Sequence, residues 1–183
     1  MARYREDYYV DNIIAMILLG FLLSELLNLL HCFYRITSKN IRMMKANKLT
    51  PNFEVSDVKQ TVDFYSKYLG FKLIMAVPEG QDGIDESFSE EKEYVYAMVQ
   101  KDYVEIFFQR SDSFKDDVVF SQGLSIGASV SFYMDIEGIK ELHEDLKAKN
   151  LQITELKTTW YGMQEFYLKD INGYILGFAE KAK

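Results

Sequence analysis

The sequence contains few of the residues that cross-link a chain, break its regular elements or keep it disordered. Of 183 residues, one is cysteine, two are proline and ten are glycine. A single cysteine, Cys32, excludes an internal disulfide and a cysteine-rich zinc site, which favours a reducing compartment. The scarcity of proline and glycine excludes low-complexity linkers and collagen-like repeats. With 48% hydrophobic residues, the chain has enough apolar material for one packed domain and an appendage.

Several motifs that carry chemistry are also missing. The sequence has no glycine-rich phosphate loop and no nucleophile elbow, and residues 49–183 contain no cysteine. Nucleotide binding and covalent acyl transfer therefore have no support. The two histidines, His31 and His143, lie in the N-terminal segment and beside Glu144 in a predicted helix. Neither histidine indicates a metal site.

Charge divides the chain in two. Residues 1–48 hold seven Lys and Arg against four Asp and Glu, a net +3, whereas residues 49–183 hold 14 against 24, a net −10. A domain of charge −10 repels phosphate backbones, so we expect no nucleic-acid partner and favour a cationic small molecule. The alternative is an acidic surface that serves only solubility.

Residues 13–30 are almost continuously apolar, interrupted by a Ser-Glu pair and one Asn. The pattern predicts a hydrophobic helical extension over residues 1–48, with apolar side chains almost all round the helix. The polar interruptions make it a marginal membrane span. Three interpretations stay open: translated upstream sequence before a start at Met43 or Met44, membrane association of residues 13–30, and a helix that packs on a partner. In each of them we expect residues 49–183 in the cytoplasm.

Residues 49–183 contain the same order of elements twice. The first copy predicts a strand, a helix and three strands at 52–55, 58–70, 71–77, 94–99 and 104–109. The second copy predicts them at 129–136, 139–150, 151–157, 164–169 and 174–179. Val55 and Val58 match Ile136 and Ile139 at an offset of 81 residues. We therefore predict an α+β domain of two tandem βαβββ modules over 49–183. The Asn172-Gly173 pair predicts a tight hairpin turn, because both residues tolerate positive φ.

Four segments in order carry a family resemblance. They are Phe53-Glu54-Val55-Ser56-Asp57-Val58, Phe64-Tyr65, Leu69-Gly70-Phe71, and Tyr161-Gly162-Met163-Gln164-Glu165-Phe166 followed by Asp170-Ile171-Asn172-Gly173-Tyr174. Together they resemble the vicinal oxygen chelate superfamily, which groups glyoxalase I, extradiol dioxygenases, and fosfomycin and bleomycin resistance proteins. The resemblance is closest to the bleomycin-resistance-like members and implies the glyoxalase/bleomycin resistance fold, with an N-terminal hydrophobic helical extension outside it.

The resemblance also bears on metals and assembly. Metal-dependent members bind one divalent ion through His or Glu on four strands, at positions that correspond to Thr50, Glu105, Ser131 and Gly177 in this sequence. Only Glu105 is a good ligand, and one carboxylate cannot hold such an ion, so we expect no metal and no cofactor. Members of this type commonly complete each cleft with modules from two subunits, which implies a homodimer.

Strand alternation predicts which side chains face the cleft between the modules. They are Asn52, Glu54, Glu105, Phe107, Gln109, Tyr133 and Asp135, with Trp160 and Tyr161 near the rim. Three carboxylates beside aromatic rings suit a cationic or aromatic ligand.

The leading hypothesis is therefore a metal-free binding protein of the bleomycin resistance type, which sequesters a small molecule in an acidic cleft. The alternative is a metal-dependent glyoxalase- or dioxygenase-type lyase or isomerase with a divergent site. Glu105 acting alone as a general base, and ordinary packing of these side chains, also stay open.

Overall fold

The computed structural model describes residues 20, 22–31, 45–127 and 129–182, and the chain divides into units 1–48 and 49–183. The second unit contains two four-stranded sheets, which confirms the α+β class and the two βαβββ modules. The first module consists of β1 (Asn52–Val55), α2 (Val58–Leu69), β2 (Lys72–Pro78), β3 (Tyr94–Lys101) and β4 (Val104–Arg110). The second consists of β5 (Ser131–Asp135), α4 (Ile139–Ala148), β6 (Lys157–Thr158), β7 (Met163–Lys169) and β8 (Ile175–Lys181). Between them lie α3 (Ser111–Asp117) and the 3₁₀ turn η1 (Val119–Ser121).

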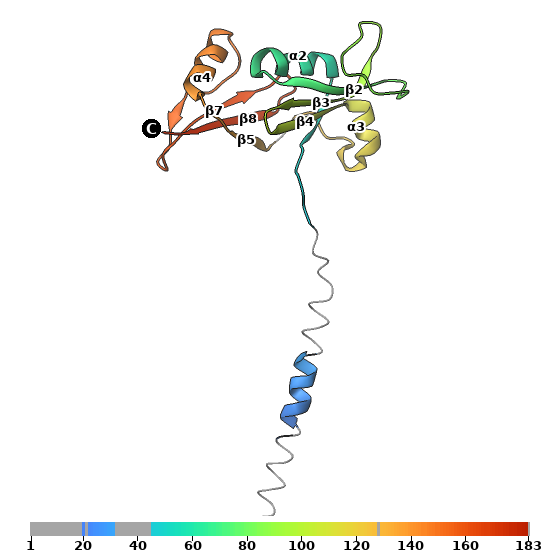
Figure 1. The fold of residues 1–183 in the computed structure, drawn as a ribbon, viewed down its shortest axis with the longest axis vertical. Helices are drawn as coiled ribbons and strands as arrows, with labels where there is room; N and C mark the ends of the chain where they lie inside the picture. The colour runs from blue at the N-terminus through green and yellow to red at the C-terminus, as the bar shows by residue number, and fades with distance from the viewer. Residues whose placement is uncertain (1–19, 21, 32–44, 128, 183) are drawn as a thin grey trace, which may run out of the picture. The chain divides into compact units, whose positions relative to one another are not determined.

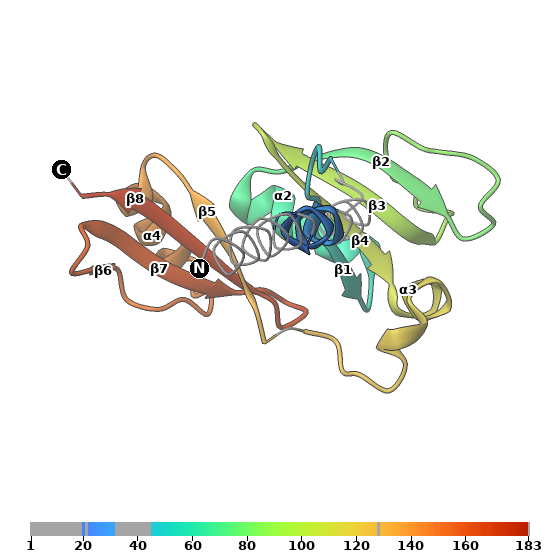
Figure 2. The same cartoon turned by 90° about the horizontal axis from the view of Figure 1, so that it is seen from below.

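The two sheets have equivalent topology. Their strand orders are β1-β4-β3-β2 and β5-β8-β7-β6. In each sheet the module's first strand in the chain pairs in parallel with its last, β1 with β4 and β5 with β8. Figure 1 shows α2 and α4 on the same side of the two sheets, and Figure 2 views the opposite side. We call that opposite side the inner face. The hydrophobic core fills the space between the sheets and the helices, as strand alternation predicts.

Local sequence signals determine the bounds of α2. Asp57 precedes the helix and its carboxylate accepts a hydrogen bond from the Gln60 backbone N–H at 2.9 Å. Gly70 ends it with φ of 72°, a left-handed conformation that glycine adopts without strain. The predicted end of the helix at Gly70 is confirmed. The buried side chains in between follow helical spacing, so α2 presents one apolar stripe to the core.

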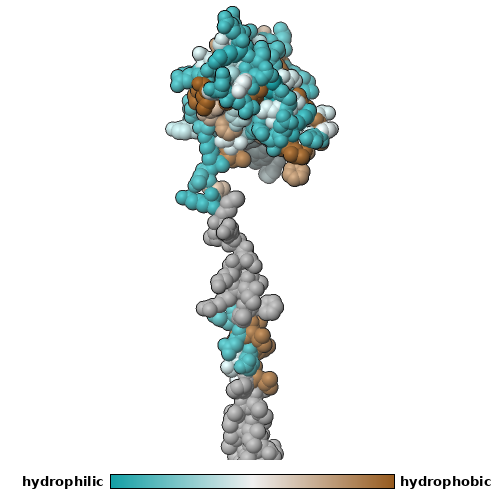
Figure 3. Space-filling view, turned by 90° about the vertical axis from the view of Figure 1, so that its right-hand side faces the viewer, coloured by the Kyte–Doolittle hydropathy of each residue, from teal (hydrophilic) through white to brown (hydrophobic). Residues whose placement is uncertain are grey.

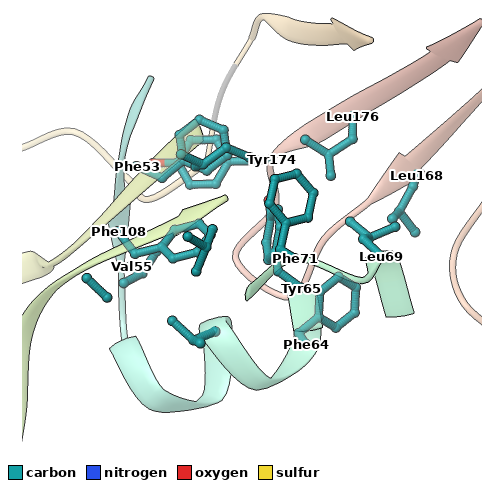
Figure 4. Packing of buried hydrophobic residues seen from close by; sticks show 14 of the residues in the cluster. Phe53, Val55, Phe64, Tyr65, Leu69, Phe71, Phe108, Leu168, Tyr174 and Leu176 are labelled. Atoms are coloured by element: carbon teal, nitrogen blue, oxygen red, sulfur yellow. The ribbon is translucent and has the colours of Figure 1, made fainter. Parts of the chain in front are cut away.

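A turn of the second module completes the core of the first. Residues 170–174 connect β7 to β8, and the Tyr174 ring stacks on Phe53 at 4.2 Å between ring centroids (Figure 4). The Tyr174 hydroxyl donates to the backbone oxygen of Glu54 at 3.0 Å. The buried Tyr65 hydroxyl donates to Asp170 at 2.9 Å, and burial together with this carboxylate raises the pKa of Tyr65. The two modules therefore share one core.

Two predicted elements of the second module were wrong in detail. Of the strand expected at 151–157, only Lys157 belongs to a ladder, together with Thr158, because the preceding segment contacts β7 through isolated bonds such as the bridge of Ile153 to Leu168. The turn is also longer than the predicted two residues. Gly173 has φ of 90° but Asn172 does not have positive φ, because the Asp170 carboxylate closes a five-residue turn by accepting from the N–H groups of residues 172 and 174.

In the first unit, residues 20 and 22–31 are helical. The polar residues Ser24, Glu25, Asn28 and His31 follow a spacing that places them on one side of the helix, and Figure 3 shows separate hydrophilic and hydrophobic sides. The expectation of apolar residues almost all round is therefore wrong for this stretch. None of the helices described here is both long and apolar enough to span a membrane. The predicted membrane association of residues 13–30 falls partly on residues outside the described ones and, like the cytoplasmic location, stays a prediction.

Candidate functional site

On the inner face of the first sheet, α3 packs against β1 and β4 at one end of the sheet (Figure 2). Strand alternation places Asn52, Glu54 and Gln109 on this face, and the structure joins them to the helix that follows β4. The Gln109 amide accepts a hydrogen bond from Asn52 at 2.8 Å and donates to Ser113 at 2.9 Å and to Asp117 at 2.6 Å. The polar groups of Gln109 are therefore satisfied by the chain itself.

Glu54 is also paired within the chain. Its side chain is nearly buried, the residue being 4% exposed, and it lies 3.1 Å from the ammonium of Lys115. The Ser111 hydroxyl donates to the same carboxylate oxygen at 2.5 Å. A buried carboxylate needs such partners, because burial without them costs several kcal/mol. The first sheet thus presents no unpaired acidic group at this position.

Aromatic side chains lie beside this polar network. Phe107 contacts Tyr96 on β3, with 5.4 Å between ring centroids. Burial, with a smaller contribution from the Asp117 carboxylate, raises the pKa of Tyr96 to about 12, so the phenol stays protonated. Glu105 lies opposite Gln100, toward the other end of β4.

The inner face of the second sheet has a different arrangement, centred on Glu165 of β7. The hydroxyls of Tyr133 and Tyr161 donate to one oxygen of this carboxylate at 2.7 and 2.6 Å. Glu165 is 8% exposed, yet no cationic side chain among the described residues forms an ion pair with it. Lys157 lies opposite Glu165 in the sheet without reaching ion-pair distance. We call Tyr133, Tyr161 and Glu165 the tyrosine–carboxylate cluster.

The environment of the cluster keeps both phenols protonated. Desolvation and then the bond to Glu165 raise the pKa of Tyr133, and the bond to Glu165 is the main cause that raises the pKa of Tyr161. Both hydroxyls therefore remain donors to Glu165 at neutral pH. Tyr133 is still half exposed, and Trp160, which meets Tyr161 edge to face at 5.3 Å, is 95% exposed.

Gly177 on β8 forms the floor of this cluster. A Cβ atom at this position would lie 2.9 Å from the Tyr167 ring and 3.3 Å from the Tyr133 ring. Both distances are shorter than ordinary van der Waals contact, so the two rings lie over the glycine because it has no side chain.

Comparison with known proteins agrees with this architecture. The family model described as "Glyoxalase/Bleomycin resistance protein/Dioxygenase superfamily" matches residues 52–178. The chain belongs to this superfamily. The fold resembles a glyoxalase-related enzyme from Clostridium phytofermentans (20% identity, TM-score 0.52, covering 76% of this chain and 98% of that one). It also resembles a glyoxalase/bleomycin resistance protein/dioxygenase from Nocardioides (12% identity, TM-score 0.57, covering 82% and 94%). No curated protein sequence is significantly similar to the chain.

The residues at the superfamily's metal positions do not fit a metal ion. Thr50, Ser131 and Gly177 offer no strong ligand, and the rings of Tyr133 and Tyr167 cover Gly177. No group of three or more His, Cys, Asp or Glu in the described part of the chain is arranged to hold a metal. Glu105 alone cannot supply the three or four protein ligands of such sites.

The structure does not bring the three predicted carboxylates together within one chain. Glu54 lies opposite Gln109, whereas Asp135 lines a cavity with Val104, five residues earlier on β4. At about 3.4 Å per residue, these two places are about 17 Å apart along the strand. Glu54 is neutralised by Lys115, so the expectation of one acidic cleft is corrected to separate polar sites.

Sequence reasoning missed Glu165 and α3. Glu165 is part of the Tyr161–Phe166 segment that carries the family resemblance. Strand alternation along β7 places Glu165 and Tyr167 on the inner face, and Phe166 and Leu168 on the other face, in the core. That signal was available. The sequence of α3, SDSFKDD, has no apolar periodicity, so only its contacts to Glu54 and Gln109 reveal its role.

Proposed function

We propose that this protein binds a small cationic, aromatic molecule on the inner face of the second module and acts by holding it, as a metal-free member of the superfamily. The observation that carries the proposal is Glu165, a nearly buried carboxylate with two tyrosine donors and no cationic partner among the described residues. A bound cation would supply the missing charge partner.

The contrast with Glu54 supports a cation at Glu165. Both carboxylates lie on inner faces and are almost equally buried, but Lys115 neutralises Glu54. Since a buried charge is stabilised by a nearby opposite charge, an ammonium or guanidinium group beside Glu165 gains an interaction that Glu54 already has.

The aromatic rings around Glu165 favour a ligand that also carries an aromatic group. Tyr133, Tyr161 and Trp160 expose ring surface next to the carboxylate. Such rings attract cations over their faces and stack on planar groups. A ligand with a cationic group and an aromatic ring would use both features.

The experiment is a titration of the full chain, followed through the fluorescence of Trp160, the single tryptophan. Probes are bleomycin and benzyltrimethylammonium, with phenylacetate as an anionic match. We expect saturable binding of at least one cationic probe, weakened by salt, and none of phenylacetate.

Two variants assign the binding to Glu165. Glu165→Gln removes the charge and should weaken cation binding at least tenfold, whereas Glu144→Gln, on the exposed side of α4, should leave it unchanged. Equal binding of phenylacetate, or cation binding unaffected by Glu165→Gln, would contradict the proposal.

We also propose that the protein is a homodimer. The exposed Val119, Phe120, Leu124 and Val130 leave apolar surface open along the segment between the modules, which a second subunit would cover. Light scattering at micromolar concentration should give twice the mass of one chain. A monomer at that concentration would contradict this assembly.

A further inference from the structure

A cavity of about 660 Å³ lies at the junction of the modules, on the helix side of the sheets. Its walls are the end of α2, the turn between β3 and β4, the end of β5 and the side of α4. The floor belongs to the hydrophobic core and includes Phe71, Leu142 and Phe178. We call this cavity the junction groove. It lies on the opposite side of the second sheet from the tyrosine–carboxylate cluster.

The internal repeat identifies the counterpart of the groove in the first module. There, the turn of residues 170–174 contacts Phe53, Glu54, Ser56 and Thr61. At the offset of 81 residues between the modules, these four positions correspond to Met134, Asp135, Glu137 and Leu142. All four of the corresponding residues line the junction groove. The groove is therefore the site that Tyr174 and Asn172 occupy in the first module, left open in the second.

The lengths of the two hairpin turns explain why it is open. Five residues, 170–174, connect β7 to β8, but only Asp102 and Tyr103 connect β3 to β4. The short turn cannot reach across to α4, and the Tyr103 side chain is fully exposed. The second module thus keeps the apolar floor that a tyrosine ring covers in the first (Figure 4).

The rim of the groove is acidic. Lys101 lies 3.7 Å from Asp102, which leaves Glu137 as a lining carboxylate with no ion pair among the described residues. Asp135 also borders the groove, but strand alternation places its carboxylate on the inner face with Tyr133. Glu137 is exposed, so it would attract a cation at the mouth rather than require one for folding.

We propose that the junction groove is a second ligand site, which binds a phenolic amine. The phenol ring takes the place that the Tyr174 ring has in the first module, over Met134. Its hydroxyl corresponds to the Tyr174 hydroxyl, which donates to the Glu54 carbonyl, and so reaches toward the carbonyl of Asp135. The ammonium group lies at the rim, beside the Glu137 carboxylate.

The test uses the full chain with its methionines labelled by ¹³C-methyl groups, and tyramine as the probe. Tyramine should shift the Met134 methyl signal saturably and leave that of Met98, on the inner face of the first sheet, unchanged. 4-Hydroxyphenylacetate has the same ring and the opposite charge, and it should shift neither signal.

Variants separate this site from the inner face. Leu142→Trp fills the groove and should weaken tyramine binding at least tenfold, and Glu137→Gln should weaken it severalfold with a smaller dependence on salt. Glu165→Gln should leave the tyramine-dependent shift of the Met134 methyl signal unchanged, because that signal reports the groove alone, so failure here and failure of the proposed function are distinguishable. An unshifted Met134 signal in the unmutated chain would overturn the proposal, whether or not Leu142→Trp folds. So would a Met134 shift that is lost with Glu165→Gln and kept with Glu137→Gln.

Discussion

The two modules have the same order of elements, but the chain fills polar and apolar positions of the first that stay open in the second. In the first module Lys115 of α3 neutralises Glu54 on the inner face, and the groove beside β1 is filled by Tyr174. In the second module Glu165 has no cationic partner among the described residues, and the corresponding groove is open. The two modules are thus similar scaffolds that differ in what α3 and the turn of residues 170–174 fill in the first and leave open in the second.

The largest effect should come from removing the ring that fills the first module's groove. Tyr174→Ala takes away a buried ring that stacks on Phe53 and should lower the free energy of unfolding by about 3–5 kcal/mol. Tyr103→Ala, in the shorter turn of the other hairpin, removes an exposed ring and should change it by less than about 0.5 kcal/mol. Urea denaturation followed by circular dichroism measures both. Similar losses in the two variants would mean that the hairpins do not differ as described.

The next largest effect should come from Lys115 of α3, which forms an ion pair with Glu54 on the inner face of the first sheet. Lys115→Met leaves the nearly buried Glu54 carboxylate without its cation and should destabilise the domain by about 1–3 kcal/mol, reduced because Lys115 is partly exposed. The same change should give the first module affinity for benzyltrimethylammonium. Lys140→Met, at an exposed position of α4, is the matched control for both measurements. No gain of binding in Lys115→Met would show that its charge is not what separates the two inner faces.

A comparable effect is expected under the tyrosine–carboxylate cluster. Gly177→Ala places a methyl group against the Tyr167 and Tyr133 rings and should cost about 1–3 kcal/mol of unfolding free energy. Tyr167→Ser should reduce that cost in the double variant, which a double-mutant cycle measures. Gly83→Ala meets no atom within 4 Å and serves as control. If the effects of Gly177→Ala and Tyr167→Ser on the free energy of unfolding are additive, the Tyr167 ring does not lie against Gly177 as described.

The smallest effect should depend on pH. Hydrogen bonds from Arg110 are the main cause that lowers the pKa of Asp112, at the start of α3, from 3.8 to about 2. Because the folded pKa is below the unfolded one, the charged carboxylate stabilises the fold above about pH 4, and this contribution is lost as pH falls toward 2. Asp112→Asn should therefore lower stability by less than about 1 kcal/mol at pH 7, with a difference from the unmutated chain that shrinks below pH 4. A difference that grows on acidification would contradict this sign.

The repeat and the side-chain alternation were readable in the sequence, because they depend on neighbours along the chain. Alternation correctly separated Phe53 and Phe108 in the core from Glu54 and Gln109 on the inner face. Alternation could not show that Lys115 reaches Glu54. Lys115 lies on α3, and a helix of seven residues is too short to be stable alone, so the sequence pattern does not predict it. The position of Asp135 at the junction groove was also hidden, because it depends on the length of a turn in the other module.

The insertion of Tyr174 into the first module also affects the order in which the chain can reach its native state. Phe53 emerges from the ribosome 121 residues before its stacking partner Tyr174. Until then the first module has an incomplete core, however well its own strands pair. The two modules therefore cannot mature one after the other as separate domains, and contacts of such long sequence separation slow folding. The hairpin of β7 and β8, in the second half of the domain, completes the first half.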